Sequence, residues 1–168
     1  VVLCGMPEYT FDNLSPLDFE LLVRDLLQEE LDIRFESFCS GKDEGIDLRH
    51  AKSESHGIIV QCKHYANTRW DKLLRSYQNE QAKVAALEPE RYIVATSQRL
   101  TPYRKQAIMD AVTPFCRSPE DVLGREDLNN LLARHPSVEK THFKLWLASV
   151  PAFFLIILTL VFSKESAF

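Results

Sequence analysis

Three residues near the middle of the sequence have the types and spacing for chemistry on a phosphate. Asp47 interrupts one apolar stretch, and Gln61 and Lys63 interrupt the most β-rich run of the chain. Because alternate residues of a strand share a face, the side chains of Gln61 and Lys63 are predicted to point the same way. An acid on one strand, with a lysine two residues after an oxygen donor on a nearby strand, suits metal-dependent hydrolysis of a phosphodiester.

The same residues fit a magnesium ion. Mg²⁺ prefers hard oxygen ligands and keeps several of its waters. Asp47 would supply a carboxylate, Gln61 an amide oxygen, and Cys62 its backbone carbonyl. Lys63 would orient the attacking water or stabilise the charge that develops on phosphorus. Mg²⁺ is therefore the predicted cofactor, and Mn²⁺ is expected to substitute for it.

Glu20 is a further candidate metal ligand. It lies beside the apolar stripe of a predicted helix, from where a carboxylate could reach over the sheet edge. A solvated glutamate on the helix flank is the alternative, and the pattern slightly favours it. The spacing of Asp47 and Q-x-K is also weak evidence by itself, because an exposed face of an edge hairpin accounts for Asp47 and Lys63 as well.

Basic and aromatic residues follow the Q-x-K run. Between Lys63 and Arg75 the only acid is Asp71, and no acid separates Arg99 from Lys105. Such a surface can contact DNA phosphates, although a solvated helix face is a common alternative. The predicted DNA-contacting residues are Lys42, His64, Arg69, Lys72, Arg75, Arg99, Arg104 and Lys105.

Periodicity predicts the elements that must position these residues. Ser15 and Pro16 are typical of a helix start, and the apolar spacing continues to about Leu31. Alternation then predicts three strands in an antiparallel meander, and a crossover helix leads to a fourth strand. The predicted ranges are strands at 33–38, 46–49, 57–63 and 91–96, turns at 40–45 and 52–57, and helices at 68–87 and 101–112. This order predicts an α/β fold with a central mixed sheet flanked by helices.

The C-terminal part differs in character. Short helices are predicted at 124–132 and from Pro136 onward. The run from Leu145 to Phe162 has 18 residues without charge, which is the lower limit for a membrane span. A helix buried against a further domain is the favoured interpretation, and a span that tethers the protein to a membrane is the alternative.

Composition limits the classes of function. The chain has 168 residues and a net charge of −4, which excludes a strongly basic packaging protein. Its four cysteines form no C-x-x-C pair, so we expect reduced thiols in a cytoplasmic protein rather than a zinc site or a disulfide framework. The first residues do not have the pattern of a signal peptide, and the initial Val1 suggests an excised piece.

Three segments carry a resemblance to a known family, namely LDFELL on the first predicted helix, GKDEGIDL, and VQCKHY. Through them the stretch from about Leu14 to Val112 resembles the Mrr-like restriction endonuclease domain, a branch of the PD-(D/E)XK superfamily. The resemblance implies an α-β-β-β-α-β core, Glu20 and Asp47 as metal carboxylates, Gln61 at the third motif position and Lys63 as the catalytic lysine. The Q-x-K motif matches the Mrr-like pattern, whereas the wider superfamily more usually has E-x-K. Because the Gln61 amide is neutral, the carboxylate of Glu20 becomes more important at the metal.

A second resemblance covers later residues. RYIVATS, LTP and LGREDLN are similar to the Mrr-like effector domain at the N-terminus of large bacterial STAND ATPases, which include Avs-type antiviral proteins. It implies an N-terminal lead at 1–13, a nuclease domain at 14–118 and a helical linker at 119–168 toward an ATPase. The sequence contains no P-loop motif of its own.

Together these features predict a Mg²⁺-dependent endonuclease that cleaves double-stranded DNA in antiphage defence. The alternative is a catalytically silent module of nuclease fold that binds DNA or a partner. Further copies of the chain are expected as partners, through a C-terminal region or as a dimer of nuclease domains, and no membrane is expected.

Overall fold

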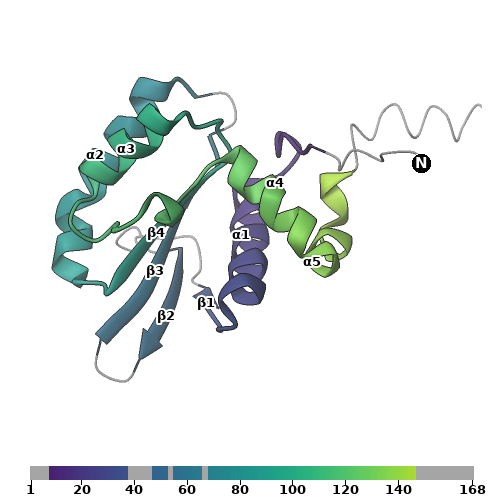
Figure 1. The fold of residues 1–168 in the computed structure, drawn as a ribbon, viewed down its shortest axis with the longest axis horizontal. Coiled ribbons are helices and arrows are strands. Elements are labelled where there is room, and N and C mark those ends of the chain that lie inside the picture. The colour runs from purple at the N-terminus through teal and green to yellow at the C-terminus, as the bar shows by residue number, and fades with distance from the viewer. Residues whose placement is uncertain (1–7, 38–46, 53–54, 66–67, 147–168) are drawn as a thin grey trace, which may run out of the picture.

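A mixed five-stranded sheet forms the centre of the molecule (Figure 1). The computed structural model describes residues 8–37, 47–52, 55–65 and 68–146. The strands lie in the order β1-β2-β3-β4-β5, the first three antiparallel and the last two parallel to their neighbours. Their bounds are β1 (Glu36–Ser37), β2 (Leu48–Lys52), β3 (Ser55–Lys63), β4 (Arg91–Thr96) and β5 (Val122–Leu123).

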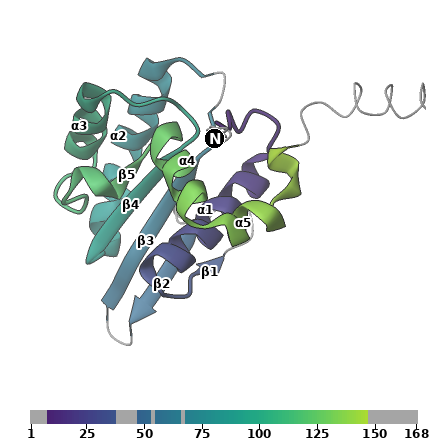
Figure 2. The same cartoon turned by 45° about the vertical axis from the view of Figure 1, so that its right-hand side comes forward.

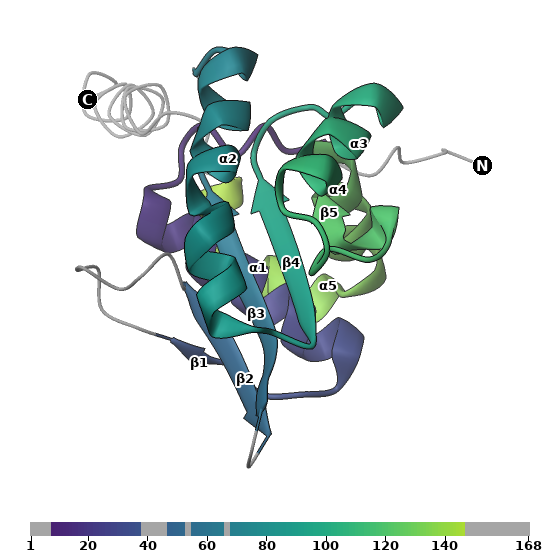
Figure 3. The same cartoon turned by 90° about the vertical axis from the view of Figure 1, so that its left-hand side faces the viewer.

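Helices cover both faces of this sheet. One face packs against α1 (Pro16–Leu31), with α4 (Arg125–Arg134) and α5 (Pro136–Thr141) beside it (Figure 2). The other face packs against α2 (Trp70–Leu87) and α3 (Pro102–Ala111) (Figure 3). Two short 3₁₀ turns, η1 (Pro119–Asp121) and η2 (Phe143–Leu145), complete the described elements. The predicted α/β fold with its antiparallel meander and crossover is confirmed.

Local sequence explains where α1 begins and ends. The Ser15 side chain accepts a hydrogen bond from the Asp18 backbone, the Asp18 side chain accepts one from the Ser15 backbone, and Pro16 takes the first helical position. Asp32 ends the helix in the left-handed conformation, with φ of 52°. The buried residues Phe19, Leu22, Val23, Leu26 and Leu27 recur at helical spacing and form one hydrophobic core with the sheet.

The parallel arrangement of β3, β4 and β5 determines where chemistry can take place. Their carboxyl ends lie at one edge of the sheet, which we call the carboxyl edge, and Lys63 pairs there with Thr96. The chain leaves this edge to begin α2, α3 and α4. In open α/β sheets the carboxyl ends of parallel strands are the usual place for ligands.

The strand boundaries differ from the predicted ones. β1 begins at Glu36, later than predicted, because the Phe35 amide donates to the Gln28 side chain and the Arg34 carbonyl bonds the His50 ring instead of pairing with the β2 backbone. The predicted end of this strand at residue 38 and the predicted turn at 40–45 lie outside the described residues. The predicted turn at 52–57 is mostly strand, since β2 reaches Lys52 and β3 begins at Ser55. Backbone pairing across a hairpin does not require apolar side chains, so the polar residues of this segment gave no sign that both strands continue through it.

Residues beyond the predicted nuclease boundary at 118 pack into the same core as α1. β5, which the sequence did not predict, pairs with β4, and Leu123, Leu128 and Leu145 join the α1 core. Gly124 starts α4 where a Cβ would meet Leu100 Cγ at 2.8 Å, so glycine permits this close approach. No helix within the described ranges is long and apolar enough to cross a membrane. Most of the apolar run at 145–162 lies outside the described residues, and the division of the chain into domains stays a prediction.

Candidate active site at the carboxyl edge of the sheet

Asp47 lies directly before β2 and is joined to β3 by its side chain. Its Oδ2 accepts a hydrogen bond from the backbone N–H of Cys62 at 2.6 Å. Leu48 pairs with Val60, so the same antiparallel register places Asp47 opposite Gln61. Because the N–H and the carbonyl of a strand residue point to the same side, the Cys62 carbonyl also faces the β2 side of β3. The fold therefore brings Asp47 and the Q-x-K segment together.

Glu20 reaches this place from α1. Its side chain is half-buried; burial raises its pKa, and the negative charge of Asp47 raises it further. Burial also raises the pKa of the Cys62 thiol, and the charges of Asp47 and Glu20 add to that effect. The two carboxylates and Cys62 are thus close enough to interact, although α1 and β3 are far apart in the sequence. Two acids that repel each other form a place that a divalent cation would stabilise.

Gln61 points into the core on the α2 side of the sheet. Only 3% of the residue is exposed, and its Oε1 accepts a hydrogen bond from the Tyr92 hydroxyl at 2.8 Å. An amide oxygen has two lone pairs, so it can accept such a bond and also serve as a metal ligand. The role of Gln61 at a metal stays a prediction. Sequence reasoning missed Tyr92, because its buried hydroxyl acts on a residue in another strand.

Lys63 is enclosed by α2. Its side chain is 11% exposed, with Nζ 4.0 Å from Oε1 of Glu80 and 5.2 Å from the centre of the Tyr77 ring. Burial lowers the pKa of Lys63, and the charges of Glu80 and Asp47 act in the opposite direction. Sequence reasoning also missed Glu80. The signal was present, because position 80 continues the helical spacing of Leu73, Tyr77 and Val84, the buried stripe of α2.

Polar residues at the end of β4 and just after it support the end of β3. The Thr96 hydroxyl donates to the Lys63 carbonyl at 3.0 Å. The Gln98 side-chain amide donates to the carbonyls of Tyr65 and Thr68, both of which lie between the end of β3 and the start of α2. Thr96 and Gln98 are buried, and the carbonyls that they bind lie beside the Q-x-K segment. The backbone that carries Lys63 is therefore held by neighbours in the sheet.

The predicted DNA-contacting residues have different surroundings. Those near the start of α2, namely Arg69, Lys72 and Arg75, are exposed, and Arg69 pairs with Asp71 at 3.0 Å. Two of the others form ion pairs, Arg99 with Glu126 at 2.6 Å and Lys105 with Asp127 at 2.8 Å. The remaining two contact aromatic rings: Arg104 lies 4.9 Å from the centre of the Trp70 ring, and the His64 ring stacks on that of Phe19 with 5.1 Å between their centres. Lys42 lies outside the described residues. Glu126 and Asp127, which pair with Arg99 and Lys105, belong to α4, and Arg99 also lies 3.8 Å from Glu8. The local sequence could not reveal these distant partners.

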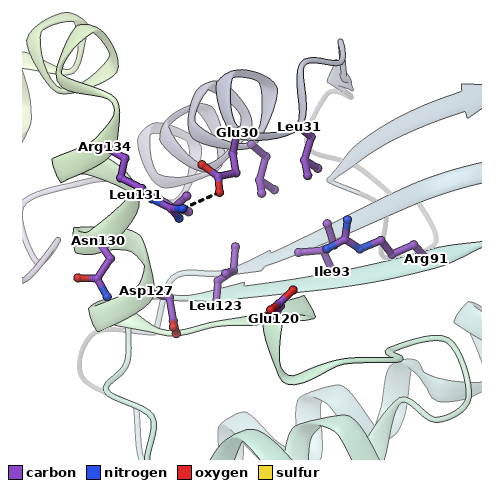
Figure 4. A pocket seen from close by; sticks show the side chains of 11 residues that line it. Glu30, Leu31, Arg91, Ile93, Glu120, Leu123, Asp127, Asn130, Leu131 and Arg134 are labelled. Atoms are coloured by element: carbon purple, nitrogen blue, oxygen red, sulfur yellow. Dashed lines mark ion pairs between the residues drawn. The ribbon is translucent and has the colours of Figure 1, made fainter.

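A cavity of about 370 Å³ lies away from these groups, between α1, α4 and the strands β4 and β5 (Figure 4). Most of its charged side chains already have partners, because Arg134 pairs with Glu30 at 2.9 Å, Arg91 with Asp121 at 2.7 Å and Asp127 with Lys105 at 2.8 Å. The rest of its lining is largely leucine and isoleucine. We assign no chemistry to this cavity.

Over the described ranges, no group of three or more histidine, cysteine, aspartate or glutamate side chains is arranged to hold a metal ion. The proposed metal-binding group has a different composition, with two carboxylates, an amide and a backbone carbonyl.

Comparison with known proteins identifies the family of the chain. Residues 11–111 match the restriction endonuclease family Mrr_cat. The chain is also 42% identical over 144 residues to the uncharacterized protein y4cD of Sinorhizobium fredii. That alignment covers 86% of this chain but 22% of the relative, so the chain spans about a fifth of the relative's length. No solved structure matches the chain significantly. The chain therefore belongs to the Mrr-type restriction endonuclease family, a family of nuclease catalytic domains.

Proposed function

We propose that this chain is a metal-dependent endonuclease that hydrolyses phosphodiester bonds of double-stranded DNA. The observation that carries the proposal is the hydrogen bond from the Cys62 amide to Asp47. It brings the acid that directly precedes β2 to the Q-x-K segment of β3, with Glu20 close by on α1 and Lys63 at the end of β3. Membership in a nuclease family supports DNA as the substrate.

Mg²⁺ is the proposed cofactor, with Mn²⁺ as a substitute. Glu20 and Asp47 would hold the ion through carboxylates, the Cys62 carbonyl would add a further oxygen, and Gln61 would add an amide oxygen. Burial raises the pKa of Glu20, and the charge of Asp47 raises it further, so a cation that neutralises this repulsion fits the site. When bound, Mg²⁺ supplies Lewis acidity toward the phosphate and lowers the pKa of a water.

Lys63 provides the positive charge of the site. Its ammonium group would stabilise the negative charge that builds up on the phosphate oxygens, which is an electrostatic effect that depends on fixed placement. The Thr96 hydroxyl fixes the Lys63 backbone, and α2 encloses its side chain. Asp47 keeps its position because it also accepts the Cys62 N–H.

DNA would approach over the start of α2. Lys72 and Arg75 are exposed there and can contact phosphates. Arg104, in the first turn of α3, lies over the ring of Trp70, the first residue of α2. Arg99 and Lys105 pair with acids of α4, so we expect them to contribute less.

The experiment is plasmid cleavage by the 168-residue chain with Mg²⁺, with Mn²⁺ and with EDTA, beside Asp47→Ala and Lys63→Ala. Nicking or linearisation that needs the metal and both residues supports the proposal. If the chain is inactive, forced dimerisation tests whether it needs clustering. A dimer that binds DNA without cutting it would instead support a silent binding module.

We further propose that the domain is an effector in antiphage defence, activated when a C-terminal region assembles several copies. Its similarity to effector domains of STAND ATPases suggests this role, and the far greater length of the related protein leaves room for a sensor and an ATPase. The test is phage plating on cells that express the full-length protein or its Lys63→Ala variant. Equal plating on both strains would contradict the role.

A further inference from the structure

Two side chains of α2 flank Lys63, although neither belongs to the Q-x-K segment. The Glu80 carboxylate lies 4.0 Å from Nζ, and the Tyr77 ring centre lies 5.2 Å from the same atom. Positions 77 and 80 are three residues apart, so they share the helix face that packs on the sheet. The lysine thus has a carboxylate and an aromatic ring as fixed neighbours on one rigid helix.

Glu80 is unusual for a surface helix because it lies in the buried stripe. Its side chain is only 17% exposed, while its second partner, Lys83, is 52% exposed and lies 3.0 Å away. A carboxylate taken out of water requires a charged or hydrogen-bonding partner. Lys83 alone could satisfy Glu80 at the surface, so the inward placement of Glu80 calls for a reason within the site.

That reason is found among the residues around Gln61. Tyr92, which bonds Gln61, has its pKa raised by burial and then by the charge of Glu80. Glu80 therefore lies near the buried group that Gln61, Tyr92 and Lys63 form. Since Gln61 is neutral, the strand itself places no carboxylate two residues before the lysine. A lysine side chain has a flexible four-carbon stem and needs a fixed partner to hold one geometry.

We propose that Glu80 is a positioning residue that, with the Tyr77 ring, holds the Lys63 ammonium group where it can meet the scissile phosphate. This inference rests on the proposed nuclease function. A small displacement of a catalytic group lowers the rate of the chemical step far more than it changes substrate binding. Removal of the Glu80 charge should therefore act on kcat and spare KM.

Steady-state cleavage by Glu80→Gln tests the proposal, with Lys83→Gln as the matched control. Both variants break the Glu80–Lys83 ion pair, but only the first removes the partner of Lys63. We expect kcat of Glu80→Gln to fall about ten- to hundredfold with KM unchanged. Lys83→Gln should retain the wild-type kcat. Equal losses in both variants, or a loss confined to KM, would overturn the proposal.

A metal titration separates positioning from metal binding. If higher Mn²⁺ concentrations restore Glu80→Gln to the wild-type rate, Glu80 acts as a metal ligand and the proposal is wrong. If the rate stays low at saturating Mn²⁺, positioning is supported. Thermal unfolding of both variants, with Glu80→Asp as a second substitution, shows whether the fold persists.

A measurement that needs no cleavage keeps this inference distinct from the proposed function. ¹⁵N NMR of the lysine side chains, with Lys63 assigned through Lys63→Arg, reports how firmly its ammonium group is held. We expect a restricted Lys63 signal in the wild type and a mobile one in Glu80→Gln. An unchanged signal would contradict the positioning role. If the wild type does not cut DNA but the signal changes as expected, the nuclease proposal fails while Glu80 still positions Lys63.

Discussion

At the scale of single residues, the buried amide of Gln61 offers a test of the site's internal hydrogen bonds. Tyr92→Phe removes the hydroxyl that donates to the Gln61 oxygen at 2.8 Å. Loss of a partner for a buried acceptor costs about 1–3 kcal/mol, so the free energy of unfolding should fall by that amount. Urea unfolding measures the change.

Tyr77→Phe is the matched control for this prediction. The Tyr77 hydroxyl is buried and has no hydrogen-bond partner within the described part of the chain. Its removal therefore relieves an unpaired polar group, and the stability of Tyr77→Phe should equal or exceed that of the wild type. If both variants lost the same stability, the Tyr92–Gln61 bond would not have the assigned value.

The sequence predicted part of this residue-scale picture. Asp47, Gln61 and Lys63 could be found because each breaks a local apolar pattern, and a register of the predicted strands could bring them together. Glu80 and Tyr92 could not be assigned roles in the same way. Their partners lie in other elements, so their functions depend on how α2 and β4 pack on β3, which local periodicity does not specify.

At the scale of elements, an ion pair between Lys144 and Asp18 joins the turn η2 to the start of α1. Lys144 Nζ lies 2.8 Å from Asp18, and hydrogen bonds from Lys144 and Ser15 lower the pKa of Asp18 from 3.8 to about 2. Because the folded pKa lies below the unfolded one, this carboxylate stabilises the fold above pH 3.8, and its contribution is lost as the pH falls toward 2.

Lys144→Met should therefore be less stable than the wild type at neutral pH, with a difference that shrinks as the pH falls below 3.8 toward 2. Urea unfolding of both proteins across this range measures it. A stability difference that stays constant in acid would show that Lys144 acts through packing rather than through the Asp18 charge.

The long elements were easier to predict than the short ones. The range of α1 follows from its cap and its apolar spacing, and the start of α3 follows from the Thr101 cap and Pro102. The range of β4 follows from a short apolar run, so each signal is local to its segment. β5 has two residues and is a strand because it pairs with β4. A segment this short has no periodic pattern from which a strand could be predicted. The late start of β1 at Glu36 follows from contacts of residues 34 and 35 with Gln28 and His50, which are likewise features of packing.

At the scale of the whole molecule, a net charge of −4 requires that DNA affinity come from local basic surface. Lys72 and Arg75 are exposed on α2, whereas Lys105 is paired with Asp127. We expect a Lys72→Ala, Arg75→Ala double variant to bind DNA more weakly, with a salt dependence reduced by about one ion for each phosphate that is no longer bound. Fluorescence anisotropy at several salt concentrations measures this.

Lys105→Ala is the control for that measurement. It removes one positive charge as well, but a charge that is already neutralised by α4. Its salt dependence should remain close to that of the wild type. A weakening as large as that from one exposed residue would show that net charge, rather than the α2 surface, determines DNA binding.

We propose that Asp47 and its neighbours at the carboxyl edge form the metal-dependent nuclease site. The most direct measurement is the plasmid cleavage rate of Asp47→Asn beside Asp71→Asn, both at saturating Mg²⁺. Each substitution removes one aspartate charge and keeps the side-chain shape, but Asp71 lies at the start of α2 and pairs with Arg69. We predict that Asp47→Asn abolishes cleavage while Asp71→Asn cuts at the wild-type rate. Cleavage by Asp47→Asn at the wild-type rate would contradict the assignment of this site.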